Sequence, residues 1–84
     1  MQTLADFKRL PTGTEIETLQ GIPKYQNVVR KIEHKQTNGI KFEGGSWLYY
    51  PNAKETTILD EKTILIESQD QDGNIWNTLK YKIV

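Results

Sequence analysis

The sequence predicts a mainly β protein of the α+β class, built as a small, strongly bent antiparallel sheet or barrel with one short N-terminal helix. Three observations predict this class. From Thr14 onward apolar and polar residues alternate in short runs, turn residues separate the runs, and a helical spacing of apolar residues occurs only before Pro11. The chain has 84 residues, which is the size of a single domain.

The expected helix covers residues 3–10. Thr3 and Asp6 stand in the pattern of a capping box in which Asp replaces the usual Glu or Gln. An apolar stripe at helical spacing is formed by Leu4, Phe7 and Leu10. Pro11 ends the helix because it has no N–H to donate. We expect this helix to lie over one end of the sheet that residues 14–84 form.

The expected strands are short and follow one another closely. The strand-like runs are residues 14–20, 28–36, 40–43, 46–50, 56–59, 63–68 and 75–84. We expect a sheet of five to six strands. In a chain of this size the economical arrangement is a partly open barrel of the SH3-like type, because closure removes exposed sheet edges.

The Asn38-Gly39 dipeptide predicts a hairpin between the second and third runs. A two-residue turn at Asn38 and Gly39 would place the apolar residues of the third run on a charged face. A three-residue loop at residues 37–39 pairs His34 with Phe42 and gathers apolar residues on one face, namely Val28, Ile32, Ile40 and Phe42. Because a slip of one residue moves every side chain to the other face, the sequence predicts the three-residue loop, with Gly39 as a left-handed bulge.

Composition and charge narrow the functions to consider. The net charge is zero, because seven basic and four acidic residues in 1–42 are balanced by four basic and seven acidic residues in 43–84. Nucleic-acid binders usually carry a clear basic excess. The absence of cysteine excludes disulfides and cysteine-based zinc sites. No apolar run has the length of a membrane span and the N-terminus is too polar for a signal peptide, so we expect a cytoplasmic protein without membrane contact.

No catalytic, cofactor-binding or metal-binding residues are expected. His34 has no serine or cysteine nucleophile near it in the sequence. The acidic run at residues 70–74 lacks the spacing of a calcium loop, and the glycine pair at 44–45 lacks the lysine and the helix of a phosphate-binding loop. The sequence therefore predicts a protein that is not an enzyme.

The run SWLYYP holds the best candidate binding residues. In a strand, Trp47 and Tyr49 point to one face while Leu48 and Tyr50 point to the other, so only one of the two pairs can face the core. Trp76 is likewise out of phase with the apolar residues of the last run. Exposed Trp and Tyr side chains mark protein interfaces. The alternative is that the N-terminal helix covers the second pair.

Residues 30–35 form a basic strand. Lys31 and Lys35 alternate onto one outer face, whereas Arg30 falls on the apolar face and must either occupy a bulge or extend to the rim. The strand is either a solvated face or a track for phosphates. In a protein complex these cations would orient the partner; beside the aromatic residues they would bind a single nucleic-acid strand.

Three motifs carry a resemblance to a known group. "TLADFKR" at residues 3–9, "QTNGIKFE" at 36–43 and "GSWLYYPNAKE" at 45–55 resemble segments of short uncharacterised proteins of bacteriophages and prophages. That group usually has lysine where Asn52 stands. The similarity covers most of residues 3–55. It implies a mobile-element accessory protein with no catalytic residues to carry over, of the kind that binds and blocks a host protein, as anti-CRISPR and other anti-defence proteins do.

The leading hypothesis is therefore a non-enzymatic phage-type accessory protein that binds a host or phage protein and inhibits or redirects it. The candidate binding residues are Trp47, Tyr49, Tyr50 and Trp76 as anchors and Arg30, Lys31 and Lys35 as orienting charges. Two alternatives stand beside it. One is a small nucleic-acid-binding β-barrel, and the other is a structural module whose aromatic residues are buried across the two-fold axis of a homodimer.

Overall fold

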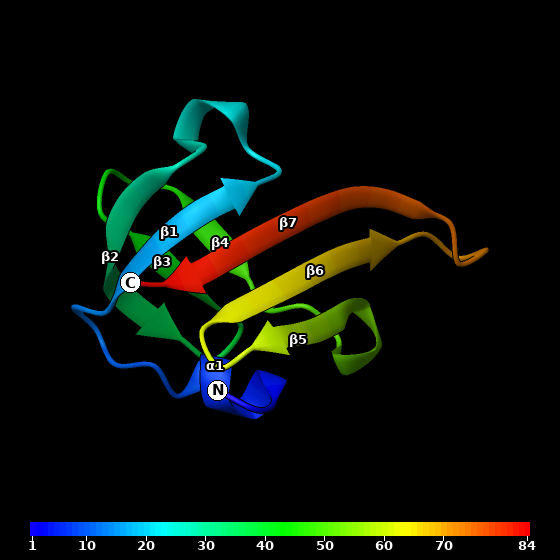
Figure 1. Cartoon of the computed structure of the whole chain (residues 1–84), viewed down its shortest axis with the longest axis horizontal. Coiled ribbons are helices and arrows are strands. Elements are labelled where there is room, and N and C mark those ends of the chain that lie inside the picture. The colour runs from blue at the N-terminus through cyan, green and yellow to red at the C-terminus, as the bar shows by residue number, and fades with distance from the viewer.

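The computed structural model describes all residues from 1 to 84 and contains one open antiparallel sheet with a short helix (Figure 1). The elements in chain order are α1 (Leu4–Lys8), β1 (Glu15–Gln20), the 3-10 turn η1 (Pro23–Tyr25), β2 (Val28–Gln36), β3 (Gly39–Phe42), β4 (Trp47–Tyr49), the 3-10 turn η2 (Ala53–Glu55), β5 (Thr56–Asp60), β6 (Thr63–Gln69) and β7 (Ile75–Ile83). The mainly β class is confirmed. The expected number of strands was too low, because all seven strands join the sheet.

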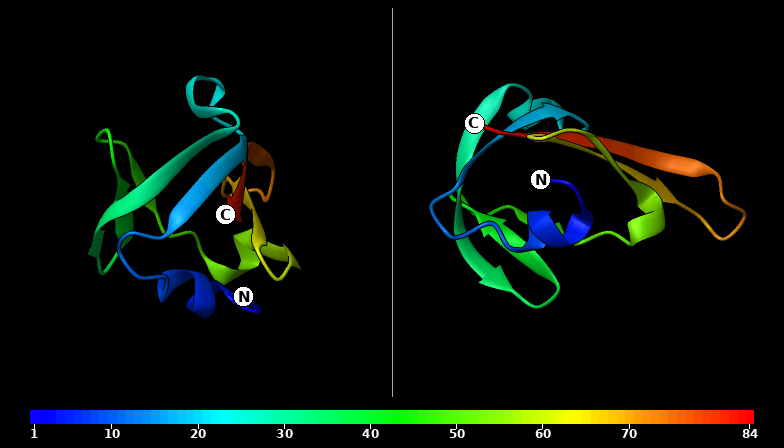
Figure 2. Two further views of the ribbon diagram at one scale, coloured as in Figure 1. Left: turned by 60° about the vertical axis from the view of Figure 1, so that its left-hand side comes forward. Right: turned by 60° about the horizontal axis from the view of Figure 1, so that its bottom comes forward.

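The strands follow one another in the order β4-β3-β2-β1-β7-β6-β5, so β4 and β5 are the two edges. The sheet is strongly curved, and α1 lies on its concave side (Figure 2). The hydrogen-bonded pairings thus describe a bent sheet with two free edges. The distal half of the β6–β7 hairpin projects beyond the rest of the molecule (Figure 1).

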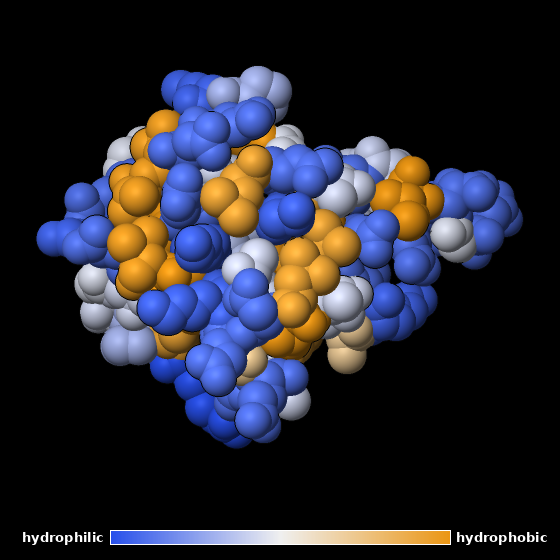
Figure 3. All heavy atoms as spheres, viewed as in Figure 1, coloured by the Kyte–Doolittle hydropathy of each residue, from blue (hydrophilic) through white to orange (hydrophobic).

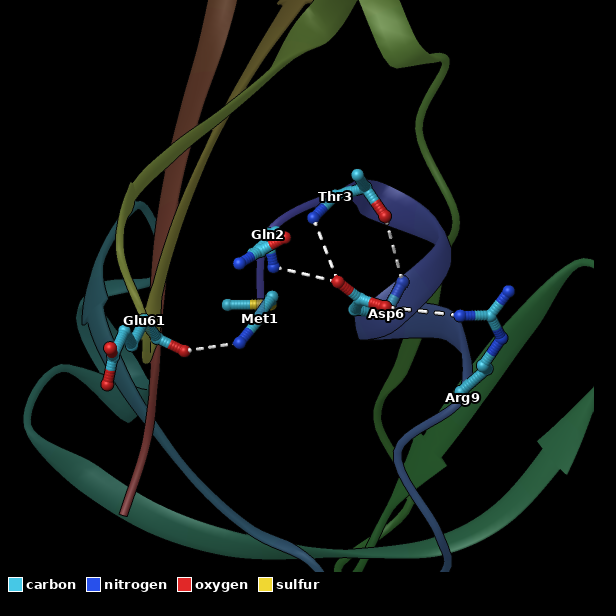
Figure 4. Close-up of polar contacts among 6 residues, drawn as sticks. All are labelled: Met1, Gln2, Thr3, Asp6, Arg9 and Glu61. Atoms are coloured by element: carbon cyan, nitrogen blue, oxygen red, sulfur yellow. Dashed lines mark hydrogen bonds and ion pairs between the residues drawn. The ribbon is translucent and has the colours of Figure 1, made fainter.

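The helix begins as the capping box predicts (Figure 4). The Thr3 hydroxyl accepts a hydrogen bond from the Asp6 backbone N–H at 3.3 Å. The Asp6 carboxylate accepts bonds from the backbone N–H groups of Gln2 and Thr3 at 2.8 and 3.2 Å. These bonds satisfy donors that the first turn of a helix leaves free. The Met1 amino group donates to the Glu61 carbonyl at 2.9 Å, which ties the N-terminus to the β5–β6 turn.

Phe7 is the buried residue of α1 and connects the helix to the core. Its side chain is buried in one cluster with the inward-facing residues of the sheet. The cluster consists of Phe7, Ile16, Ile32, Ile40, Phe42, Leu48, Ile64, Ile66 and Tyr81. The helix therefore packs against the sheet on its concave side. No helix in the structure is both long enough and apolar enough to cross a bilayer.

The β2–β3 hairpin corrects the predicted register. Gln36 pairs with Gly39, so the turn consists of Thr37 and Asn38, and His34 pairs with Lys41 rather than with Phe42. A bulge at Glu33 then shifts the ladder by one residue. Because of this extra residue, Ile32 and not His34 pairs with Phe42, and both Ile32 and Phe42 are buried. Val28, by contrast, is exposed.

Gly39 has a different role from the predicted left-handed bulge. Its φ angle is not positive. A Cβ atom at this position would lie 2.5 Å from the Leu48 carbonyl oxygen and 3.1 Å from the Tyr49 Cα. Glycine is therefore required here because β3 and β4 approach closely, which brings β4 into its place at the edge.

Candidate functional site

Strand β4 divides its residues between the core and the solvent. Leu48 is buried, whereas 39% of Trp47 and 67% of Tyr49 are exposed. Tyr50 faces the core side, and its ring meets the Phe7 ring edge-on with 6.4 Å between centroids. The Lys8 ammonium lies 5.3 Å from the centre of the same Tyr50 ring. Phe7 and Lys8 of the helix thus lie against Tyr50, Leu48 is buried in the core, and the pair Trp47 and Tyr49 faces outward.

The exposed aromatic residues lie beside polar and basic residues of the neighbouring strands. Lys41 of β3 pairs with Trp47 on one side and with His34 of β2 on the other. The His34 and Trp47 rings meet edge-on at 6.4 Å. Since paired residues share a face of the sheet, a row of side chains crosses three strands. We call His34, Lys41, Trp47 and Tyr49 the outer wing.

The bulge at Glu33 decides which cations belong to the outer wing. Lys35 pairs with the buried Ile40 and therefore does not share the face of Lys31, contrary to the predicted alternation. His34, and not Lys35, lies beside Lys41 on the outer face. Glu33 forms an ion pair with Lys41 at 3.3 Å, and because both side chains are partly exposed to solvent the contribution of this pair to stability is small. Sequence reasoning missed His34 as an outer-face residue because alternation counted from Arg30 assumes an unbroken strand.

Arg30 is not a rim residue. Only 7% of it is exposed, and its guanidinium lies between two aromatic rings, 3.9 Å from the centre of Tyr25 and 4.2 Å from the centre of Phe42. It donates hydrogen bonds to the hydroxyls of Thr18, at 3.1 Å, and of Ser46. Stacking on aromatic faces is a favourable environment for a guanidinium.

No carboxylate pairs with Arg30, and its buried Nε has no hydrogen-bond partner. Burial lowers the pKa of this guanidinium, an effect that the nearby Tyr81 and Tyr25 oppose. Arginine keeps its charge in proteins at any ordinary pH. Arg30 is therefore a buried cation that joins β1, β2 and the residue preceding β4, and it does not extend the basic surface of the outer wing.

Trp76 lies far from the outer wing in the sheet. It is 69% exposed on β7 and is itself the extra residue of a bulge, because Ser68 pairs with Asn77 and Gln69 pairs with Ile75. Strands β3, β2 and β1 lie between β4 and β7. Ile75 is exposed beside it, so the projecting β6–β7 hairpin carries a second, separate apolar site. The structure does not bring the predicted anchors together in one patch.

The face over β1, β7 and β6 offers no continuous apolar surface. Apolar side chains there form strips separated by hydrophilic ones (Figure 3). Glu17 pairs with Lys82, and Lys80 pairs with Leu65, so charges interrupt the strips. No pocket is present, and no group of three or more His, Cys, Asp or Glu side chains is placed to hold a metal ion.

Two buried phenols make the free energy of unfolding depend on pH in the alkaline range. Burial raises the pKa of Tyr50 and of Tyr81 above the ordinary value of about 10. The folded state therefore keeps both phenols neutral at a pH where the unfolded state ionises them. The contribution of the neutral phenols to the free energy of unfolding is complete below pH about 10. It decreases as the pH rises through the folded-state pKa values.

We expect Tyr50→Phe to make this alkaline loss smaller, measured by urea unfolding at a series of pH values from neutral to alkaline. At neutral pH the same variant should be as stable as the wild type or more stable by about 1 kcal/mol, because the buried Tyr50 hydroxyl has no hydrogen-bond partner. An unchanged alkaline profile would contradict the burial of this phenol.

Comparisons of the chain with protein-family models, with curated proteins and with solved structures found no match.

Proposed function

We propose that this chain is a non-enzymatic protein that binds another protein through the outer wing and thereby inhibits or redirects it. The observation that carries the proposal is the outward orientation of Trp47 and Tyr49, two large aromatic side chains on an edge strand that no element of the fold covers. Exposed Trp and Tyr gain most when a partner buries them, because they remove a large area from water and have few torsions to freeze.

The neighbouring polar groups suit the rim of such an interface. Lys41 and His34 surround Trp47 and are partly or fully exposed. Rim charges orient an approaching partner and raise the association rate more than they raise affinity. Tyr50 and Arg30 act behind this surface. Tyr50 anchors β4 to α1, and Arg30 donates to Ser46 just before β4, so both are expected to support the position of the strand rather than to contact a partner.

The identity of the partner is proposed from the sequence motifs. The resemblance of residues 3–55 to short phage and prophage proteins favours a host protein in the bacterial cytoplasm, blocked stoichiometrically in the manner of anti-defence proteins. The proposed mechanism requires no catalytic group. It requires only that this chain cover a surface that the partner uses for its own activity.

Nucleic-acid binding is the second candidate function. The ring of Trp47 beside His34 and Lys41 resembles a stacking platform with adjacent positive charge. Two features reduce the charge available to phosphates, namely the burial of Arg30 and the ion pair of Lys41 with Glu33. A track for phosphates usually needs several free cations, so we favour the protein partner.

The test is affinity capture from bacterial lysate with tagged wild type, Trp47→Ala and Tyr49→Ala, followed by titration of each purified captured protein. We expect each variant to bind at least about tenfold more weakly than the wild type, since truncating an anchor costs about 2 kcal/mol or more. The melting temperature should be unchanged within about 2 °C, because neither side chain contributes to the core.

Leu59→Ala is the matched control. Leu59 is an exposed apolar residue on the opposite edge strand, β5, and its truncation should leave affinity unchanged. Equal binding by all four proteins would contradict the proposal. An affinity for single-stranded DNA or RNA that falls steeply with salt, at an unchanged affinity for proteins, would instead favour nucleic-acid binding.

A further inference from the structure

The register of β3 with β4 determines which backbone groups of β4 are free. The Phe42 N–H donates to the Ser46 carbonyl at 2.8 Å, and the Tyr50 N–H donates to the Asn38 carbonyl at 2.9 Å. In an antiparallel ladder the groups of alternate residues point to alternate sides. Ser46, Leu48 and Tyr50 thus direct their backbone groups toward β3. The N–H and C=O groups of Trp47 and Tyr49 point away from the sheet, and no other strand pairs with β4.

The two edges of the sheet differ in how they are protected. Edge strands usually carry charges, bulges or prolines that prevent pairing with another chain. Strand β5 has a bulge between Ile58 and Asp60 and a charged C-terminal end. Strand β4 is uncharged and aromatic, and its pairing with β3 is regular. Its only protection is its shortness and the proline that follows it.

We propose that two copies of this chain associate through their β4 edges, with the strands antiparallel and a two-fold axis at Leu48. In this arrangement Trp47 of each copy is opposite Tyr49 of the other. Both residues have outward N–H and C=O groups, so each such pair exchanges two hydrogen bonds and all the free groups of both edges are satisfied. Leu48 meets its own copy at the position between the pairs, where no backbone bonds are needed.

The side chains of the two copies are also complementary in this arrangement. Directly opposite residues lie on the same face of a sheet, so Trp47 of one copy and Tyr49 of the other form an aromatic pair on the outer face at each end of the contact. Cross-strand aromatic pairs are among the favourable ones in antiparallel sheets. No charged residue lies within β4, and the chain has no net charge, so the paired strands themselves bring no like charges together.

An extended segment of an unrelated protein could use the same backbone groups, but the chain's own strand supplies the matching spacing and the aromatic side chains. The contact is short, and stable dimers usually bury about 1,200 Å² or more. We therefore expect a reversible dimer with a dissociation constant in roughly the micromolar to millimolar range. Formation of the dimer joins two outer wings into one aromatic surface.

The first test is sedimentation equilibrium of the isolated protein over a wide concentration range, for wild type, Tyr49→Pro and Tyr49→Val. Both variants lose the ring, but only proline loses the outward N–H, which makes no bond within the monomer. We expect concentration-dependent dimers for the wild type, weaker dimers for Tyr49→Val and at least about tenfold weaker association still for Tyr49→Pro. A wild type that stays monomeric, or equal association by the two variants, would overturn the proposal.

The second test needs no variant and so does not depend on how Tyr49→Pro folds. Amide hydrogen exchange of the wild type is measured by NMR at low and high protein concentration. We expect the amides of Trp47 and Tyr49 to exchange several-fold more slowly at high concentration. Ile58 is the internal control, because the ladder of β5 with β6 directs its N–H outward on the opposite edge. Slowing at Ile58 instead of at β4, or at neither edge, would refute pairing through β4.

This inference goes beyond the proposed function, and the two can fail separately. Self-association is measured with the isolated chain, whereas partner binding is measured at concentrations where the chain is monomeric. The experiments therefore distinguish a chain that dimerises but binds no other protein from a chain that binds another protein but does not dimerise.

Discussion

Replacing Arg30 by alanine is expected to lower the free energy of unfolding by about 3 kcal/mol. The change removes a guanidinium that fills the space between the Tyr25 and Phe42 rings. It also leaves the hydroxyls of Thr18 and Ser46 without their donor. A cavity and an unpaired buried hydroxyl, here that of Thr18, are two of the mechanisms that produce large destabilisation.

Two further variants, Arg30→Met and Arg30→Lys, separate the effect of lost volume from the effects of the charge and of the planar guanidinium. Methionine keeps much of the volume and removes a buried cation that no carboxylate balances, so we expect it to cost clearly less than alanine. Lysine keeps the charge but loses the planar group that stacks on both rings, so we expect an intermediate loss. Urea unfolding at neutral pH measures all three variants. A wild-type midpoint for Arg30→Ala would refute the burial of this side chain.

Gly21→Ala is expected to cost about 3 kcal/mol, from two effects that add. The φ angle of Gly21 is +106°, which L side chains rarely adopt, and a Cβ there would lie 2.4 Å from the Thr78 carbonyl oxygen and 2.5 Å from Leu79 Cδ2. Backbone strain and the clash with β7 both oppose the substitution.

Gly73→Ala is the matched control for strain alone. Its φ angle is +83°, but a Cβ at this position would meet nothing within 4 Å. We therefore expect a loss of only about 1 kcal/mol. Thermal and urea unfolding of the two variants should show this difference. Equal losses would mean that the approach of residue 21 to β7 is looser than the structure shows.

Much of the fold could be predicted from local patterns. The capping box at Thr3, the end of the helix near Pro11 and the strand runs all appear close to their predicted positions. Ile16 is buried between exposed or partly exposed glutamates, as the alternation requires. These features depend on residues near one another in sequence, where caps, turns and alternation act. All seven runs could be recognised in the sequence, but the expected sheet held only five to six strands, whereas each of the seven runs forms a strand of the sheet.

The register of the β2–β3 hairpin could not be predicted from turn residues alone. The extra residue at Glu33 allows a two-residue turn at Thr37 and Asn38 while Ile32 and Phe42 remain paired in the core. Nothing in the local sequence marks Glu33 as the bulge. Burial of apolar side chains on both strands selects it, and the choice then moves Lys35 off the face of Lys31 and places His34 beside Trp47.

For the candidate site, the sequence by itself determined that Trp47 and Tyr49 must point away from Leu48 and Tyr50, because a strand alternates. It did not determine which pair faces water. Packing of Phe7 against Tyr50 turns that pair inward, and the position of β4 at the sheet edge leaves Trp47 and Tyr49 exposed. The burial of Arg30 was decided in the same way, since its rings and hydroxyls come from β1, β3 and two loops. Such contacts join residues distant in sequence, so only the tertiary structure could decide them.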